Sequence, residues 1–157
     1  MSDLDAVARR LRSRANTIRG GDAQEIVGQR LRAGGLELVQ RVETGWRVQR
    51  VRGRITGASP MGKVHCDWSA IVPGTGQSVR CEVKSRKDSQ LSLSDFERWQ
   101  LDALTAHTAF GGLTLIGHVH SRGVAVLRWP LVGLEKGRPL NAYDERWTAA
   151  LWDGVRP

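Results

Sequence analysis

Two carboxylates and a lysine are the residues of this chain whose types and spacing could do chemistry. Asp67 is followed, after fourteen intervening residues, by Glu82, Val83 and Lys84. Carboxylate oxygens are hard ligands that suit Mg²⁺, and an ammonium group can stabilise negative charge on a reacting phosphate. These residue types therefore favour metal-assisted hydrolysis of a phosphodiester. The alternative interpretation is a solvated charged face, because charged residues are mostly exposed in folded proteins.

The hydrophobic pattern around these residues predicts how they are brought together. Residues 65–72 and 78–84 read as strands, with a Pro- and Gly-rich turn between them. Pairing Trp68 with Cys81 collects the apolar side chains on one face and places Asp67 opposite Glu82, whereas a slip of one residue destroys that segregation. Side chains alternate along a strand, so Glu82 and Lys84 share a face. Two facing carboxylates repel each other, and a divalent cation would relieve that repulsion.

Glu25 is a third candidate carboxylate. It follows Asp22 by three residues at the expected start of a helix that Gly34 and Gly35 end. Asp22 and Glu25 can therefore form a capping box, which is the structural role that this spacing predicts. A glutamate near a helix start can also point at the sheet, so both roles for Glu25 stay open on the residues alone.

The chain is strongly basic, and its charge is unevenly placed. The net charge is +8 and the pI is near 10.7. Residues 1–66 hold 13 basic and six acidic residues, whereas residues 67–157 hold 11 and 10. The span 46–66 contains five basic residues and no acidic one, and it reads as a basic hairpin or stalk with its tip at 57–62. This distribution indicates a polyanionic partner, most simply nucleic acid.

The remaining elements predict an α/β fold in one domain, residues 1–157. Residues 1–19 read as a basic N-terminal helix or arm, and further helices are expected from Asp22, at 94–109 and at 141–152. Strands are expected at 36–42, 113–120 and 124–129, in addition to the two that carry the carboxylates. This order predicts a central mixed β-sheet flanked by helices.

Composition excludes several classes of protein. The two cysteines, Cys66 and Cys81, exclude a disulfide framework and a Cys-rich zinc site. No stretch approaches the about 20 apolar residues that span a bilayer. The first 21 residues lack the apolar core of a secretory signal. We therefore expect no membrane association and a location in the reducing cytoplasm.

The ordered series of motifs resembles the PD-(D/E)xK nuclease superfamily, and more narrowly Holliday junction resolvases of the RecU and Hjc types. The matching segments lie within residues 19–130: they are residues 19–25, Cys66-Asp67, Glu82–Ser85, 96–100 and Gly111-Gly112. In two places the sequence departs from the pattern, since Cys66 replaces a proline and Trp99 stands where related sequences often have histidine. The resemblance implies a restriction-endonuclease-like core with the basic 46–66 segment as a protruding stalk.

The resemblance also implies the composition of the site. A divalent cation, Mg²⁺ with Mn²⁺ able to replace it, would be held by two carboxylates and a backbone carbonyl. The implied ligands are Asp67, Glu82 and the carbonyl of Val83, with Glu25 as an accessory carboxylate. The implied catalytic residues are Glu25, Asp67, Glu82, Lys84 and Gln100.

The expected function is a metal-dependent, structure-specific endonuclease that resolves four-way DNA junctions in recombination and repair. A junction is two-fold symmetric, so a homodimer with one site per subunit would supply paired nicks. Basic residues of the arm, of the stalk and directly after the strand at 78–84 would hold the DNA backbone without reading sequence. The predicted DNA-binding residues are Arg9, Arg10, Arg12, Arg14, Arg19, Arg47, Arg50, Arg52, Arg54, Lys63, Arg86 and Lys87.

Other interpretations remain open on the sequence. The same chemistry could act on DNA ends, flaps or foreign DNA, or in RNA processing. A non-catalytic DNA-binding module would bind DNA without Mg²⁺-dependent cleavage. His118 and His120 could pair as metal ligands on a strand, although no third ligand is near them in sequence, and a rim or partly buried strand face is the simpler interpretation.

Overall fold

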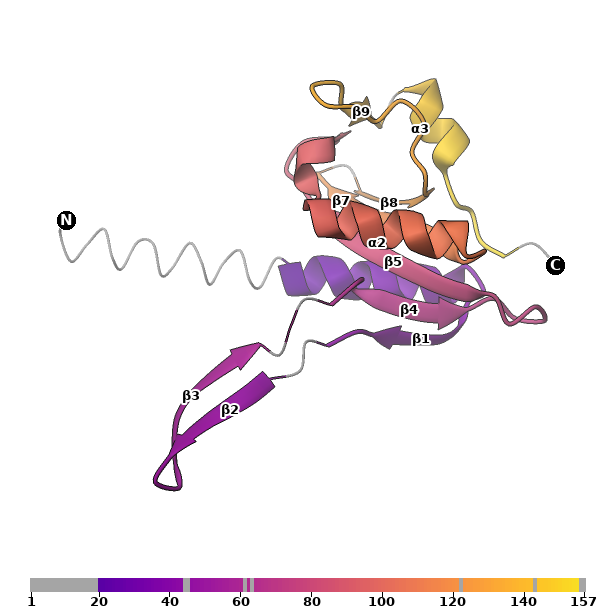
Figure 1. Ribbon diagram of the computed structural model, residues 1–157. Coiled ribbons are helices and arrows are strands. Elements are labelled where there is room, and N and C mark those ends of the chain that lie inside the picture. Colours follow the sequence, from indigo (N-terminus) through magenta and orange to yellow (C-terminus); the bar gives the residue numbers. More distant parts are fainter. Residues whose placement is uncertain are drawn as a thin grey trace.

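A five-stranded mixed sheet organises the chain in the computed structural model, which describes residues 20–43, 46–60, 62, 64–121, 123–142 and 144–155. The strand order is β1-β4-β5-β7-β8; β5 and β7 are parallel, and the other neighbouring pairs are antiparallel. Its strands are β1 (Glu37–Arg41), β4 (Trp68–Ile71), β5 (Ser78–Ser85), β7 (Leu113–His120) and β8 (Gly123–Arg128). The predicted α/β class with a central mixed sheet is thereby confirmed (Figure 1).

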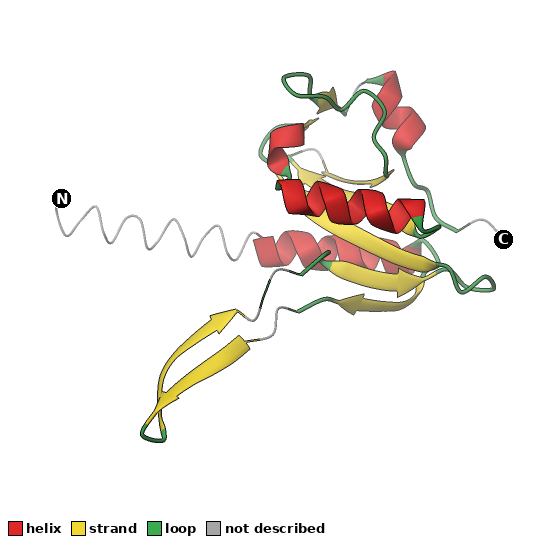
Figure 2. Cartoon of the chain, viewed as in Figure 1, coloured by secondary structure: helices red, strands yellow, loops and turns green. Residues whose placement is uncertain are grey.

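Helices cover both faces of this sheet. The helix at residues 20–33 packs its apolar side chains against β4, β5 and β7 in one buried cluster. The second cluster lies on the other face, under α2 (Arg98–Ala109) and α3 (Glu145–Ala150). Figure 1 shows α2 in front of the sheet and the 20–33 helix behind it, and Figure 2 shows the same layers by secondary structure. No helix in the described part of the chain is long and apolar enough to cross a membrane.

The helix over the first face does not begin at Asp22, as the capping box predicted. Gly20 and Gly21 are themselves helical, so Asp22 lies inside the helix. A glycine weakens a helix by only about 1 kcal/mol, and tertiary packing of the apolar face supplies most helical stability in proteins. The predicted end is confirmed, because the helix stops at residue 33 and Gly35 takes a positive φ of 88°. The predicted arm, residues 1–19, lies outside the described residues.

The β4–β5 pairing has the predicted register. Trp68 pairs with Cys81 and Ala70 with Val79, and all four side chains are buried in the cluster under the 20–33 helix. Because β4 begins at Trp68, Asp67 lies immediately beyond the paired part of the strand. Its backbone is nevertheless fixed, since its N–H donates to the Cys81 carbonyl at 3.0 Å and its carbonyl accepts from the neighbouring β1 side at 2.9 Å.

The basic segment forms a hairpin, as predicted, but its tip lies elsewhere. β2 (Trp46–Val51) and β3 (Arg54–Pro60) pair as a separate antiparallel ribbon that projects from the body (Figure 1). The turn is Arg52-Gly53, and both residues have positive φ, 50° and 78°, as a two-residue type I′ turn requires. The run 57–62, predicted as the tip, instead begins within β3. The basic side chains therefore gather at the end of the hairpin.

The start of α2 also differs from the prediction. A short 3-10 turn, η1 (Leu93–Asp95), occupies the residues expected to open the helix, and the cap of α2 is Glu97. Glu97 and Gln100 form the capping box of α2. This later start brings the Gln100 side chain, in the first turn of α2, to β5.

The C-terminal helix is shorter than predicted. Residues 141–152 were expected to be helical, but α3 covers only Glu145–Ala150. Leu140–Asn141 form the short strand β9, which pairs with β6 (Gln90–Leu91). Leu91 and Leu140 of this ribbon are fully buried in the second cluster, so burial of these two leucines competes with helix extension.

Candidate active site

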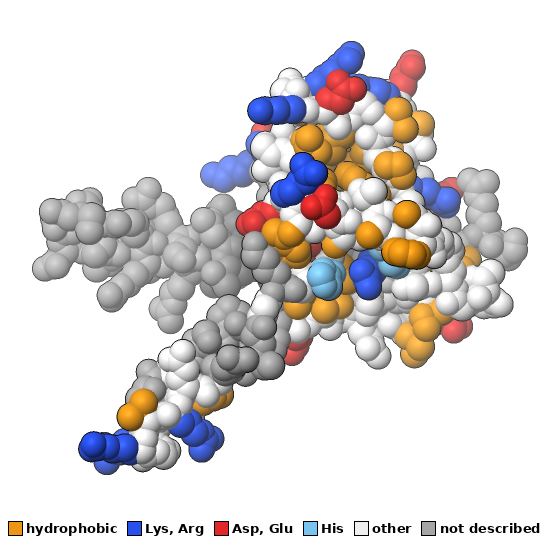
Figure 3. Space-filling model, viewed as in Figure 1, with side chains coloured by type: hydrophobic (Ala, Val, Ile, Leu, Met, Phe, Trp, Pro, Cys, Tyr) orange, Lys and Arg blue, Asp and Glu red, His pale blue; other side chains and the backbone are white. Residues whose placement is uncertain are grey.

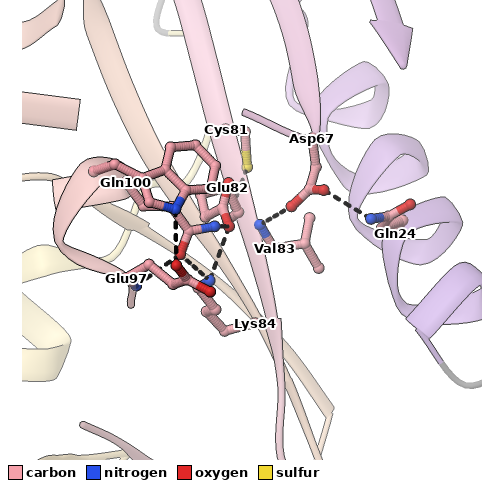
Figure 4. A network of polar contacts seen from close by, with 9 residues as sticks. Gln24, Asp67, Cys81, Glu82, Val83, Lys84, Glu97 and Gln100 are labelled. Atoms are coloured by element: carbon pink, nitrogen blue, oxygen red, sulfur yellow. Dashed lines mark hydrogen bonds and ion pairs between the residues drawn. The ribbon is translucent and has the colours of Figure 1, made fainter. Parts of the chain in front are cut away.

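The candidate site lies where β5 runs on beyond the end of its neighbour β4. Because the two strands are antiparallel, the pairing with β4 stops at its first residue, Trp68, which lies opposite Cys81. β5 continues to Ser85 and stays paired with β7 on its other side. One edge of β5 is therefore open from Glu82 onward. Figure 4 shows Asp67 at this open edge, with Glu82 and Lys84 on β5 itself.

The Asp67 carboxylate occupies the position that a further β4 residue would take. Its Oδ2 accepts a hydrogen bond from the Val83 backbone N–H at 2.7 Å, and its Oδ1 accepts one from Nε2 of Gln24 at 2.7 Å. Paired strand residues exchange both N–H and C=O bonds along one edge, so the Val83 carbonyl points to the same edge as its N–H. The structure therefore places the Asp67 carboxylate beside the backbone carbonyl that was predicted as a metal ligand.

Glu82, Lys84 and Gln100 form a closed polar triangle on the α2 face of the sheet (Figure 4). Lys84 Nζ donates to Glu82 Oε1 at 2.8 Å and to Gln100 Oε1 at 2.9 Å, and Gln100 Nε2 donates to the same Glu82 Oε1. The Phe96 ring centroid lies 4.9 Å from Nζ, and this cation–π contact holds the ammonium further. The second oxygen of Glu82, Oε2, accepts no hydrogen bond from the residues that the structure describes.

Burial makes both carboxylates reluctant to ionise. It raises the pKa of Asp67, while the Val83 N–H and the charge of Lys84 oppose that rise. It also raises the pKa of Glu82, and the nearby Asp67 charge raises it further, against the opposing charge and hydrogen bond of Lys84. A buried and a half-buried carboxylate that repel each other gain much from an added positive charge.

The structure does not bring Glu25 to this site. Its side chain is exposed, and its Oε1 lies 3.7 Å from an Arg32 nitrogen. In the described part of the chain, no group of three or more His, Cys, Asp or Glu side chains converges to hold a metal ion. The capping-box role of Glu25 is also wrong, because the helix begins before Asp22.

Gln24, the residue before Glu25, contacts Asp67 instead, and the sequence reasoning missed it. The signal was available in the helical period, because Gln24 lies four positions before Gly28 and seven before Leu31. Leu31 is fully buried and Gly28 packs on Trp68. Gln24 is therefore on the stripe that faces the sheet, whereas Glu25 is on the flank.

The predicted DNA-binding residues lie on the β2–β3 hairpin, at the end of β5, or outside the described residues. Arg50, Arg52 and Arg54 are exposed at the end of the β2–β3 hairpin, where Figure 3 shows the basic side chains gathered. Lys87 is exposed, whereas Arg86 is engaged by the carboxylates of Asp88 and Asp95. Arg47 lies in β2. The others lie outside the described residues: Arg9, Arg10, Arg12, Arg14, Arg19 and Lys63.

His118 lies deeper than the rim or partly buried face that its alternation with His120 favoured. The side chain is fully buried, and neither ring nitrogen has a hydrogen-bond partner among the residues that the structure describes. Its ring centroid lies 5.1 Å from that of His120 and 5.2 Å from that of Trp147 on α3. Burial, and then the charge of His120, lower the pKa of His118 to about 4.

The fold matches a solved archaeal structure. Hjc of Archaeoglobus fulgidus, a Holliday junction resolvase from a hyperthermophile, superposes with a TM-score of 0.52 at 17% sequence identity; the match covers 86% of this chain and 91% of that chain. No family model and no curated protein sequence matches the chain. The architecture that the resemblance implied, a mixed sheet with helices on both faces, is thus one that this chain has in common with the resolvase structure.

Proposed function

We propose that this protein is a metal-dependent endonuclease that cleaves branched DNA, with the four-way junction as its substrate. One observation carries the proposal: at the open edge of β5 the Asp67 carboxylate binds the Val83 N–H, while the next residues on either side, Glu82 and Lys84, form an ion pair close enough to Asp67 for its charge to raise the pKa of Glu82. The fold in common with an archaeal junction resolvase supports the choice of reaction and substrate.

The donors at this edge fit a hard divalent cation. Asp67 is half-buried and Glu82 is buried, and ionisation of both is disfavoured. Among the described residues none donates to Glu82 Oε2, and the Val83 carbonyl points at the same edge as its N–H. Mg²⁺ is held by one or two carboxylates and keeps several waters, so this small donor set is of the right kind. We infer that Asp67, Glu82 and the Val83 carbonyl would hold Mg²⁺ or Mn²⁺. Such a cation, when bound, polarises a phosphoryl oxygen and lowers the pKa of a bound water.

Lys84 would stabilise the negative charge that develops on the reacting phosphate. Two acceptors, Glu82 Oε1 and Gln100 Oε1, fix its ammonium group, and Phe96 covers it. A donor that is held in place before the reaction needs no reorganisation during it, which is the source of its catalytic effect. Gln100 supports this arrangement from α2, because its amide accepts from Lys84 and donates to Glu82.

Binding of the DNA would rest on the basic surfaces. The β2–β3 hairpin presents Arg50, Arg52 and Arg54 away from the sheet, and phosphate contacts of this kind fix position without reading sequence. Paired nicks across a two-fold junction would need two sites, so we propose a homodimer with one site in each subunit.

A substrate panel tests this proposal. The full chain is incubated in Mg²⁺ with labelled four-way junction, flap, linear duplex and single-stranded DNA, and Asp67→Asn serves as the matched control. We expect junction cleavage by the wild type only. Stronger cleavage of flaps or ends would keep the chemistry and change the substrate. Tight junction binding without cleavage of any substrate in Mg²⁺ or Mn²⁺ would contradict the proposal and favour a binding module.

A further inference from the structure

Each of the two carboxylates accepts a hydrogen bond from a glutamine on a different helix. Gln24, on the helix that covers one face, donates from Nε2 to Asp67 Oδ1 at 2.7 Å. Gln100, on α2 over the other face, donates from Nε2 to Glu82 Oε1. Each carboxylate is thus held by a hydrogen bond from the helix on its own side of the sheet (Figure 4).

The two glutamines differ in how their amide oxygens are satisfied. Oε1 of Gln100 accepts from Lys84 Nζ and from the Glu97 backbone N–H. Oε1 of Gln24 is buried and has no hydrogen-bond partner among the described residues. Turning the Gln24 amide over would set Oε1 against Oδ1 of Asp67, acceptor against acceptor. The observed orientation therefore leaves a buried oxygen unpaired and gives Asp67 a donor, which is costly for stability alone.

The backbone holds Gln24 in this place. The Trp68 indole N–H donates to the Gln24 carbonyl at 2.9 Å, and Trp68 is the residue directly after Asp67. One turn later, Gly28 lies so close that a Cβ there would meet the Trp68 ring at 2.4 Å. The helix therefore packs directly on Trp68, the residue after Asp67. This contact fixes the distance from the Gln24 backbone to the Asp67 carboxylate.

We propose that Gln24 is a positioning residue: its amide holds the Asp67 carboxylate in the plane of the sheet, on the Val83 N–H and beside the Val83 carbonyl. The consequence for catalysis rests on the proposed function, because a carboxylate that ligates a metal depends on the hydrogen bonds that orient it. The effect on Asp67 itself does not rest on it and is measurable in the metal-free protein.

Hydrogen exchange of the Val83 amide reads out the position of Asp67. In the wild type this amide is protected by its bond to Oδ2. In Gln24→Met, which keeps the volume and removes the donor, we expect its exchange to accelerate about tenfold or more, while amides of β7 exchange as in the wild type. Gln24→Glu keeps the shape but presents only acceptors, and it should accelerate Val83 exchange as well. Gln29→Met, an exposed position on the same helix, is the matched control.

Binding of Mn²⁺ to the full chain, followed by calorimetry, gives the second readout. We expect Gln24→Met to weaken binding about 10- to 100-fold, and Gln29→Met to leave it unchanged. Wild-type exchange at Val83 in both Gln24 variants would overturn the positioning role, as would unchanged Mn²⁺ affinity in Gln24→Met. A wild type that binds no Mn²⁺ would contradict the proposed function instead, and the exchange of Val83 would still decide the role of Gln24.

Discussion

Burial disfavours the charged forms of Asp67 and Glu82 and raises the pKa of both, and this effect has a cost in stability that can be measured. A carboxyl group whose folded pKa is raised binds protons more readily in the folded state than in the unfolded one. Its contribution to stability is therefore full below the ordinary carboxylate pKa and is lost as the pH rises through the folded value. Residues placed for function in this way destabilise the metal-free protein near neutral pH.

The first prediction concerns this effect of burial. Without divalent cations, the free energy of unfolding of the wild type should fall, relative to Asp67→Asn, as the pH rises above the ordinary carboxylate range. Urea titrations of both proteins between pH 4 and 8 measure the difference. Mg²⁺ should restore the wild type at pH 8 and leave Asp67→Asn unaffected. A difference that stays constant with pH would show that the folded protein does not perturb Asp67.

The second prediction separates chemistry from binding. Asp67→Asn and Glu82→Gln should each abolish junction cleavage, because each removes a ligand charge while keeping the shape of the side chain. Junction affinity should be retained or rise, since a charge that repels phosphate is lost. Cleavage assays and gel-shift titrations of the same preparations provide both values. Loss of binding together with loss of folded signal would mean that the carboxylates are structural.

The third prediction concerns Lys84. Lys84→Ala should lower the maximal cleavage rate at saturating Mg²⁺ by about 100-fold or more, comparable to removing one pre-organised charge donor. The Mg²⁺ concentration at half-maximal rate should change far less. Lys136→Ala, an exposed lysine outside the site, is the control. Recovery of the full rate in Lys84→Ala at higher Mg²⁺ would assign the lysine to metal binding.

At this scale the structure brings together the predicted strand residues and Gln100 of α2, but it does not bring Glu25 to them. Asp67, Glu82 and Lys84 follow from one strand register, which the burial of Trp68 and Cys81 fixes. The resemblance implied Glu25 as an accessory carboxylate, and the spacing from Asp22 predicted a capping box, but the helix extends through Gly20 and Gly21 and leaves Glu25 exposed. In a helix, moving by one residue turns the side-chain direction by about 100°. An error of one position, such as Glu25 in place of Gln24, therefore selects a different face of the helix.

Among the secondary-structure elements, β7 carries a buried group that the proposed chemistry does not use. His118 packs against Trp147 of α3, and within the described part of the chain both of its ring nitrogens lack a hydrogen-bond partner. Its pKa falls from 6.5 to about 4 on burial, so the folded state resists protonation. A base whose pKa is lower in the folded state stabilises the fold above the unfolded pKa. That stability is lost as the pH falls from 6.5 toward 4.

The fourth prediction is that His118→Leu removes this acid sensitivity. Between pH 6.5 and 4 the wild type should lose up to about 3 kcal/mol relative to the variant. At pH 7 the variant should be at least as stable, because an apolar side chain leaves no buried polar atom unpaired. Thermal unfolding of both proteins across this range tests it. Parallel pH profiles would show that His118 has a hydrogen-bond partner in solution.

The fifth prediction concerns the β2–β3 hairpin. Changing Arg50, Arg52 and Arg54 to alanine should weaken DNA binding and flatten the slope of log K against log salt by about 2–3, because each lost phosphate contact removes about 0.9. Folding should survive, since these side chains are exposed. The control with the same charge change alters three exposed basic residues elsewhere: Arg128, Lys136 and Arg138.

A comparison of junction with plain duplex decides what the hairpin recognises. A larger loss on the junction would show recognition of branching. An equal loss would make the hairpin a general phosphate clamp, and no loss on either substrate would mean that its charges form only a solvated surface.

Most of the described elements were predicted in kind and order, although β6 and β9 were not expected, and the hairpin tip and the start of α2 depend on features that a pattern does not show. The hairpin tip falls at Arg52-Gly53 because Arg52 accepts a positive φ, which is uncommon for residues other than glycine. The Gly- and Pro-rich run downstream looked like the better turn. The start of α2 moved because Ser92 and Asp95 cap a separate 3-10 turn before Glu97.

For the whole molecule, the sheet supplies the geometry that the proposed reaction needs. Glu82 and Lys84 lie on β5, which pairs with β7 between helices on both faces. Asp67 lies just before β4, and its N–H donates to the Cys81 carbonyl of β5, so the sheet holds all three residues in place. A short segment of chain joins the hairpin to Asp67, because β3 ends seven positions before that residue.

The mixed sheet was predictable because alternation and turn chemistry agree along most of the chain. A second subunit, which paired nicks would need, leaves no comparable pattern in one sequence. Light scattering of the full chain at micromolar concentration measures the oligomeric state directly. A dimer is expected, and a monomer that still cuts both strands of a junction would contradict the two-site account.

Cleavage of a supercoiled plasmid that extrudes a cruciform tests the central claim most directly, because it reports metal dependence, branch dependence and pairing of nicks together. In Mg²⁺ the wild type should convert the plasmid to the linear form with cuts placed symmetrically about the cruciform, whereas Asp67→Asn and the wild type in EDTA should leave it supercoiled. Equal cleavage by Asp67→Asn, or no cleavage by the wild type in Mg²⁺, would contradict the claim that Asp67, Glu82 and Lys84 form a metal-dependent nuclease site.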